Sequence, residues 1–167
     1  MLHMILELYQ HHFWANRKVM ECVSALSPAQ FTQPLDYSVG SVQQQLFHIA
    51  YWEHYWFNTL RRGTVLNGEA LLRVDDYPDI ASMQYLYGQN QKLVDSVLEA
   101  LSDDDLDRTL ALERRGQSRE FTTWRILFQM YGHALDHRAQ VLAALHRFGA
   151  PTCEQTYMFY MVERDRT

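Results

Sequence analysis

The chain has 167 residues, of which 47% are hydrophobic and 21% charged, and its formal net charge is −5. This length and apolar content fit one domain with a substantial core and exclude a disordered chain. The acidic balance, without a run of Lys or Arg, argues against nucleic acid and against an anionic membrane surface as partners.

The first predicted helix runs from about Leu2 to Leu26, where apolar side chains recur every three or four residues. Ser27 and Pro28 follow, a pair typical of the cap and first position of a new helical turn. A second helix is predicted after Gly40. The residues that delimit it are the N-cap Ser41 and the terminal Arg61, Arg62 and Gly63.

The next stretch, 62–79, is too irregular for an element of its own. Asp79 then has the character of a helix cap, and the apolar positions from Met83 to Leu101 keep a nearly strict heptad. A heptad of this kind is typical of the seam between helices in a bundle. The sequence therefore predicts a third long helix there.

Residues 102–120 begin with an acidic turn and continue as two short runs around Arg115-Gly116, which predicts a small β-hairpin. The last long helix is predicted from Thr122 or Thr123 to Phe148, ended by Gly149 and Pro151. The tail 156–164 predicts a short final helix. Together these elements indicate one all-α domain over 1–167, a four-helix bundle with crossover topology.

Cysteine usage and the N-terminus bear on the compartment. Cys22 and Cys153 are too few for a disulfide framework, the first residues do not resemble a signal peptide, and no run approaches the roughly 20 apolar residues of a membrane span. We therefore expect a cytoplasmic protein. Both cysteines are interpreted as small apolar residues rather than nucleophiles.

His133 and His137 are spaced four apart on the last long helix, so both rings lie on one face and can reach one metal ion. This spacing alone does not distinguish ligands from surface histidines. Met130 and Val141 share the face, which indicates that the pair points inward. A metal ion would satisfy one nitrogen on each ring and leave the other for a neighbouring acceptor.

His48, beside the apolar stripe of the second helix, is the preferred third ligand, although His12 competes with it on pattern alone. His54 ranks lower. Three imidazoles leave a coordination position for water or substrate, and an all-nitrogen set favours zinc, nickel, iron or copper over magnesium and calcium. The histidines expected at the surface or termini are His3, His11 and His146.

Glu53 and Arg138 interrupt apolar helix faces. The favoured interpretation is a buried ion pair, with each other or with a residue such as Arg17, and the alternative is a contact behind the metal ligands or with substrate. A cluster of aromatic residues is interpreted as core or interface, with the floor of a ligand pocket as the alternative. Its members are Tyr51, Trp52, Tyr55 and Trp56.

Three motifs carry a family resemblance. HFWANRKVMECVSALSPAQF contains a Trp-Ala-Asn signature, SVGSVQQQLFHIAYWEHYWF has a serine seven residues before its first histidine, and the last helix contains His-x-x-x-His-Arg-x-Gln. In these three motifs and in their order along the chain, the sequence resembles the DinB family of DinB/YfiT-like metalloenzymes. The resemblance covers nearly the whole chain. The sequence departs from the family at Ala139, where Gly is frequent, and at Gln155-Thr156, where an acidic residue is common.

The resemblance implies a four-helix bundle, often a homodimer, that binds a divalent transition metal (zinc, nickel or iron), and it favours His48 over His12 as the third ligand. It also implies a reaction that uses a low-molecular-weight thiol, because some relatives are thiol-dependent transferases, isomerases or hydrolases. We therefore expect a thiol S-transferase acting on a small electrophile. The alternatives are a metal-dependent hydrolase, disfavoured because no paired carboxylates lie near the histidines in the sequence, a non-catalytic metal-binding stress-response protein, and a ligand-binding module.

Overall fold

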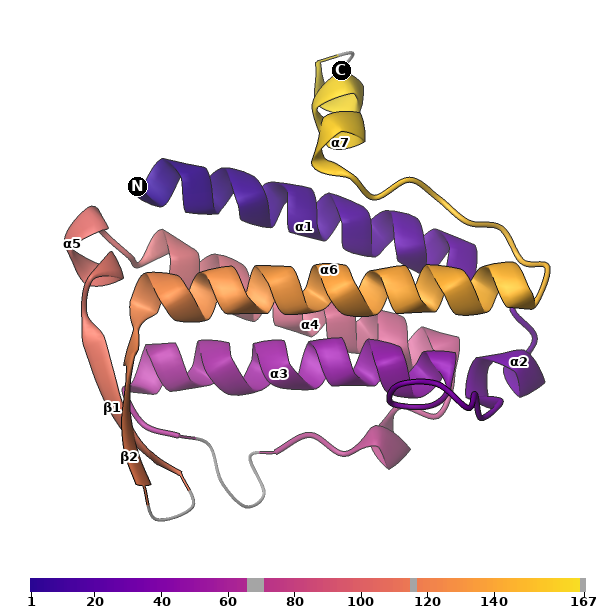
Figure 1. The fold of residues 1–167 in the computed structure, drawn as a ribbon, viewed down its shortest axis with the longest axis horizontal. Coiled ribbons are helices and arrows are strands. Elements are labelled where there is room, and N and C mark those ends of the chain that lie inside the picture. The colour runs from indigo at the N-terminus through magenta and orange to yellow at the C-terminus, as the bar shows by residue number, and fades with distance from the viewer. Residues whose placement is uncertain (66–70, 115–116, 166–167) are drawn as a thin grey trace.

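The computed structural model describes residues 1–65, 71–114 and 117–165. Four long helices form a bundle: α1 (Leu2–Val23), α3 (Val42–Arg62), α4 (Ile80–Glu99) and α6 (Thr123–Arg147) (Figure 1). The predicted four-helix bundle is confirmed. In the part of the chain that is described, no helix is both long and apolar enough to cross a membrane.

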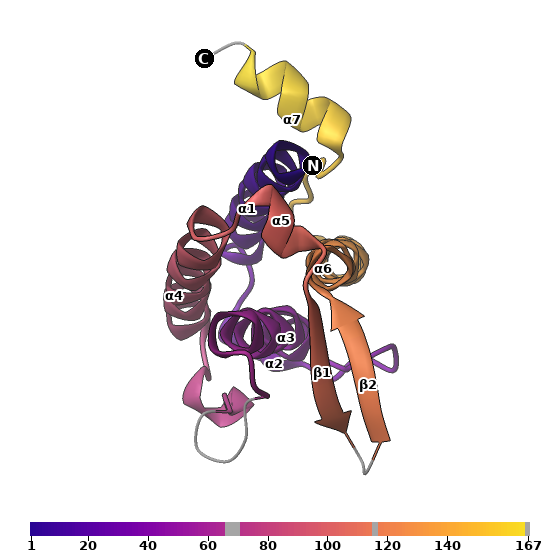
Figure 2. The same cartoon turned by 90° about the vertical axis from the view of Figure 1, so that its left-hand side faces the viewer.

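Neighbouring helices of the bundle do not simply alternate in direction. Viewed along its axis, the helices follow one another around the ring as α1, α4, α3 and α6 (Figure 2). Helices α1 and α6 run in one direction, and α3 and α4 in the other (Figure 1). The chain must therefore return along the bundle between α3 and α4, by way of a short 3-10 helix, Val74–Asp76. This return is the predicted crossover.

Local capping explains where α3 begins and ends. The Ser41 backbone N–H donates to Oε1 of Gln44 at 2.9 Å, and the Gln44 N–H donates to Oγ of Ser41 at 3.2 Å. Gly40 precedes the cap with φ +100°, a conformation that favours glycine, and a Cβ there would push the capping Gln44 side chain aside. Gly63 ends the helix in the left-handed conformation. The predicted boundaries of this helix are confirmed.

Helix α1 is shorter than predicted. It ends at Val23 rather than Leu26, because hydrogen bonds from the Ala25 N–H to the Cys22 carbonyl and from the Leu26 N–H to the Val23 carbonyl tighten the chain into a turn.

The shorter elements follow the predictions, with one correction. The expected acidic turn is a one-turn helix that buries Leu106. The shorter elements are α2 (Pro28–Thr32), α5 (Asp103–Leu106), the antiparallel strands β1 (Thr109–Arg114) and β2 (Gln117–Thr122), and α7 (Tyr157–Arg164). The predicted hairpin turn at Arg115-Gly116 lies outside the described residues.

Two large apolar clusters lie along the bundle, and a third, small one packs α7 against α1. One large cluster contains Val19, Leu46 and Val141, and the other contains Phe13, Phe57 and Met130. On α6 the stretch between Met130 and Val141 lies between these two clusters, and it contains His133 and His137. On α3, His48 lies between Leu46 and Ala50, two members of the first cluster.

Candidate metal centre

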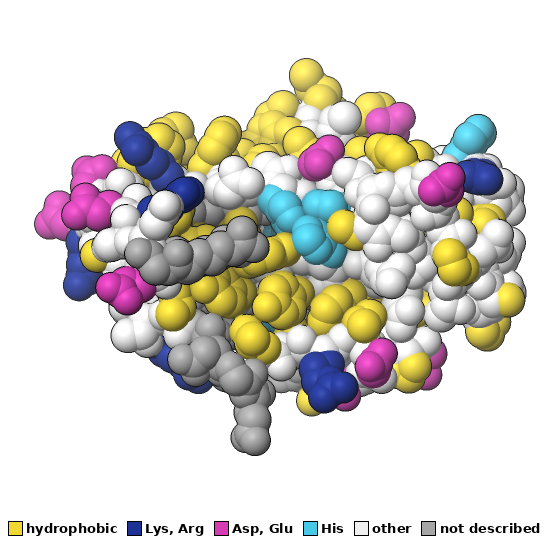
Figure 3. All heavy atoms as spheres, turned by 60° about the horizontal axis from the view of Figure 1, so that its bottom comes forward, with side chains coloured by type: hydrophobic (Ala, Val, Ile, Leu, Met, Phe, Trp, Pro, Cys, Tyr) yellow, Lys and Arg dark blue, Asp and Glu magenta, His cyan; other side chains and the backbone are white. Residues whose placement is uncertain are grey.

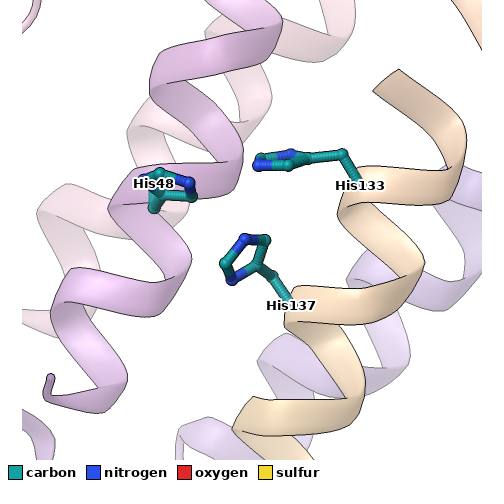
Figure 4. Close-up of side chains that lie close together, drawn as sticks. All are labelled: His48, His133 and His137. Carbon is teal, nitrogen blue, oxygen red and sulfur yellow. The ribbon is translucent and has the colours of Figure 1, made fainter. Parts of the chain in front are cut away.

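His48 of α3 meets His133 and His137 of α6 where these two helices pack side by side (Figure 4). One ring nitrogen from each lies within 4.8 Å of the others. The ring centroids are 5.0 Å apart for His48 and His133, and 4.5 Å apart for each ring with His137. Three nitrogens at these separations could hold one metal ion.

The cluster lies at the edge of the helix pair and not in the centre of the bundle. His48 and His133 are half-buried and His137 is buried. Figure 3 shows a patch of histidine side chains at the surface, bordered by hydrophobic side chains. A ligand can therefore approach the three rings from solvent.

The chemistry of the donors fits a transition metal. Nδ1 of His137 lies 2.7 Å from Oε1 of the buried Gln45, so Nδ1–H donates to the amide oxygen and Nε2 keeps its lone pair. Gln45 is one turn before His48 on α3. Such an acceptor behind a ligating imidazole fixes both its tautomer and its orientation.

Burial keeps the three imidazoles neutral, as metal binding requires. It lowers the pKa of His48 and of His137, with the neighbouring His137 adding to the effect on His48. Burial, then His137 and His48, lower the pKa of His133 to about 4. At neutral pH the three rings therefore offer lone pairs without first losing protons.

We expect Gln45→Leu to weaken metal affinity by about 10- to 100-fold, because His137 would lose the acceptor that orients it. The measurement is a competition titration against a chromophoric chelator. Gln43→Leu is the matched control, since Gln43 lies on the same turn but donates to the Tyr77 carbonyl in the crossover. Equal affinities for the two variants would show that this hydrogen bond does not orient the ligand.

His12 is not the third histidine of the cluster. It is fully buried on α1, where Nε2 lies 2.6 Å from Oε1 of Glu53 and Nδ1 lies 2.9 Å from Nη1 of Arg138. Because the guanidinium can only donate, Nδ1 accepts, and the proton of the neutral ring is on Nε2, next to the carboxylate. The expected direct ion pair of Glu53 with Arg138 is thus wrong in detail: a neutral imidazole joins the two charges.

Arg138 has further acceptors in the same buried network. Its Nη1 donates to Oδ1 of Asn16 and its Nε donates to Oε1 of Gln155, both at 2.9 Å. Gln155 belongs to the segment in which the family's common acidic residue is missing. In this chain the amide oxygen of Gln155 accepts the hydrogen bond from the Arg138 guanidinium.

The expectation that His11 lies at the surface is wrong. Only 1% of His11 is exposed, because the C-terminal segment folds back over α1. Its Nε2 donates to the Gln155 carbonyl at 2.8 Å and its Nδ1 accepts from the Tyr131 hydroxyl at 2.9 Å. This histidine therefore anchors the segment that leads to α7.

The aromatic cluster extends from the histidines towards the hairpin. Ring contacts link His48 to Trp52, Trp52 to Tyr55 and Tyr55 to Trp56. Trp56 in turn contacts Phe121 of β2, with ring centroids 5.4 Å apart. The rings on α3 are half-buried, so they serve as core on one side and border the open histidine cluster at the His48 end.

The cysteines fit the prediction that they are not nucleophiles. Cys22 is buried and Cys153 half-buried, and neither forms a disulfide. Burial and the adjacent Cys22 raise the pKa of Cys153 to about 12. That thiol is protonated at neutral pH.

Sequence reasoning did not identify Gln45 as a functional residue. The available signal was a polar side chain three residues before His48, next to the apolar Leu46 and one turn from Ile49. It was also missed that Tyr131 and Gln155 are the partners of the buried His11. Their pairing depends on the path of the C-terminal segment.

Two solved structures from Bacillus subtilis resemble this fold. The DinB-like protein YjoA shares 18% identity over 85% of this chain and 91% of its own, with a TM-score of 0.64. YfiT, described as a probable metal-dependent hydrolase with an unusual four-helix bundle topology, shares 17% identity over 87% of each chain, with a TM-score of 0.63. No match was found among curated proteins. The sequence profile of the DinB family matches residues 1–166, and the chain therefore belongs to the DinB family.

Proposed function

We propose that this protein is a metal-dependent S-transferase that joins a low-molecular-weight thiol to a small apolar electrophile. The observation that carries the proposal is the open cluster of His48, His133 and His137. Among the residues that the structure describes, no fourth His, Cys, Asp or Glu lies at ligand distance from this cluster. Structural zinc sites usually close with four protein ligands, whereas reactive sites leave a position open.

The side chains present support each requirement of this reaction. The three neutral imidazoles would hold a zinc, nickel or iron ion, and Gln45 keeps His137 in the ligating tautomer. When bound there, a divalent ion would lower the pKa of a coordinated thiol from its free value of about 8.5. A nucleophile activated in this way needs no nearby general base.

The surroundings indicate the class of electrophile. The half-buried rings of Trp52 and Tyr55 continue from His48 along α3 and offer an apolar surface to the body of a substrate. Asp136, exposed on α6, contributes negative charge that partly opposes the lowering of the pKa of His133 and His137 by burial. This charge favours a bound cation and disfavours a strongly anionic substrate.

A metal-dependent hydrolase is the second candidate. It is favoured by the description of YfiT as a probable metal-dependent hydrolase. In that reaction water takes the place of the thiol. Its pKa can fall to about 7 at such an ion.

Titrating the cobalt-substituted protein with small thiols tests the first candidate. Glutathione, cysteine, bacillithiol or mycothiol should add a sulfur-to-cobalt charge-transfer band, with apparent affinity that rises with pH below the pKa of the free thiol. His133→Ala protein provides the control and should show no band.

If none of the four thiols perturbs the spectrum at millimolar concentration, the transferase proposal fails. Turnover of ester or amide substrates by the same protein would then favour the hydrolase. If the bound ion had no exchangeable water, the metal would be a brace within the bundle.

A further inference from the structure

A cavity of about 340 Å³ opens between α1 and α4, away from the three-histidine cluster on the α3–α6 pair. Figure 2 shows α1 and α4 as neighbours in the ring, with α4 on the opposite side of the bundle from α6. The volume is at the lower end for small-molecule sites. Neither the proposed reaction nor the metal ligands use this space.

Glu53 reaches the inner wall of the cavity from α3. Only 4% of this residue is exposed, so its carboxylate is nearly removed from bulk solvent. Its contact with His12 engages one oxygen, Oε1. Among the described residues no Lys or Arg side chain donates to either oxygen of this carboxylate, although each oxygen can accept two hydrogen bonds.

The charge of Glu53 is incompletely neutralised from within the protein. Arg138 donates to His12 and Asn16 and not to the carboxylate, so a neutral imidazole is the direct partner of Glu53. A buried carboxylate in this position gains from a cationic donor on its open side. Arg17 and Glu21, which have opposite charges, also line the cavity.

The remaining walls are suited to an apolar group. Phe13 and Met20 of α1 and Tyr87 of α4 line the cavity. The Tyr87 hydroxyl is engaged with the Leu46 carbonyl at 3.0 Å, which holds the ring in place across the helices. Apolar surfaces around one buried carboxylate match a molecule with one charged end.

We propose that this cavity is a second binding site, for a small organic cation with a primary ammonium group and an apolar or aromatic body. The ammonium donates to the Glu53 carboxylate, and the body packs against Phe13, Met20 and Tyr87. The site does not depend on the metal, so the proposal stands or falls separately from the S-transferase.

Calorimetric titration with 2-phenylethylamine and with 2-phenylethanol tests the charge requirement. The two probes have nearly the same shape, but only the amine is cationic at neutral pH. We expect the amine to bind about tenfold or more tightly than the alcohol, because only the amine pairs with the buried carboxylate. The His133→Ala/His137→Ala protein should bind it equally well, which separates this site from amine ligation to a metal.

Two glycine variants test the location. Gly88 lines the cavity on α4, and an added Cβ there meets no atom within 4 Å, so Gly88→Leu should fill the space without disturbing the fold. Gly132→Leu on α6, where a Cβ is equally free, is the matched control. Amine binding should be lost in the first variant and unchanged in the second.

Glu53→Gln should remove the preference for the amine over the alcohol if the variant folds. If Glu53→Gln does not fold, the Gly88→Leu variant still tests the proposal. The inference is overturned if the amine binds no more tightly than the alcohol to the native protein, if neither probe binds at millimolar concentration, or if Gly88→Leu binds the amine as the native chain does.

Discussion

Replacing both His133 and His137 by alanine is expected to reduce bound transition metal from a stoichiometric amount to a trace. The double substitution removes two of the three nitrogens that lie within 4.8 Å of one another and leaves His48 alone. A single imidazole on a helix holds a divalent ion far more weakly than three convergent ones. The measurement is elemental analysis of protein purified without a histidine tag and without added metal.

His146→Ala is the control for this loss. His146 is exposed in the last turn of the same helix, so its removal should leave metal content unchanged. Circular dichroism should show that the doubly substituted bundle remains helical, because its long helices bury two apolar clusters independently of the site. Stoichiometric metal in the double variant would place the binding site elsewhere.

Arg138→Met should destabilise the protein by about 3–5 kcal/mol, the cost typical of removing one partner from a buried charged network. The Arg138 side chain is fully buried and donates to His12, Asn16 and Gln155. Methionine fills much of the volume but leaves those acceptors without a donor, and Glu53 without a compensating positive charge nearby. The measurement is urea unfolding followed by circular dichroism.

Arg147→Met, at an exposed position on the same helix, is the matched control and should leave the unfolding midpoint nearly unchanged. Adding Glu53→Gln to Arg138→Met should cost less than the sum of the two single changes, since the remaining uncompensated charge is then removed. If Arg138→Met unfolds at the same urea concentration as the control, the network contributes little to stability.

The helix boundaries were predictable because the interactions that set them are local in sequence. Ser41 with Gln44, and Asp79 with Ser82, are pairs three residues apart whose hydrogen bonds form wherever the chain turns into a helix. The pairing of His133 with His137 on one face follows from helical geometry in the same way. These features required no knowledge of how the helices pack.

Tertiary packing decides which histidine is the third member of the cluster. His48 and His12 occupy similar apolar stripes, and only the family resemblance separated them in the sequence. In the bundle α3 lies beside α6, which brings His48 to His133 and His137, while His12 faces Glu53 in the interior. The crossover between α3 and α4 establishes this neighbour relation, and its irregular sequence contains no periodic signal of it.

Sequence alone therefore determined the all-helical class, the four long helices and the placement of the histidine pair on one helix face, because each depends on residues within one or two turns of one another. Only the tertiary structure decided that a neutral His12 joins Glu53 to Arg138, that Gln45 supports His137, and that the C-terminal segment buries His11. Each of these contacts links residues more than 40 positions apart in the chain. Partners at such separations meet only through the packing of whole helices, which propensity, capping and periodicity do not specify.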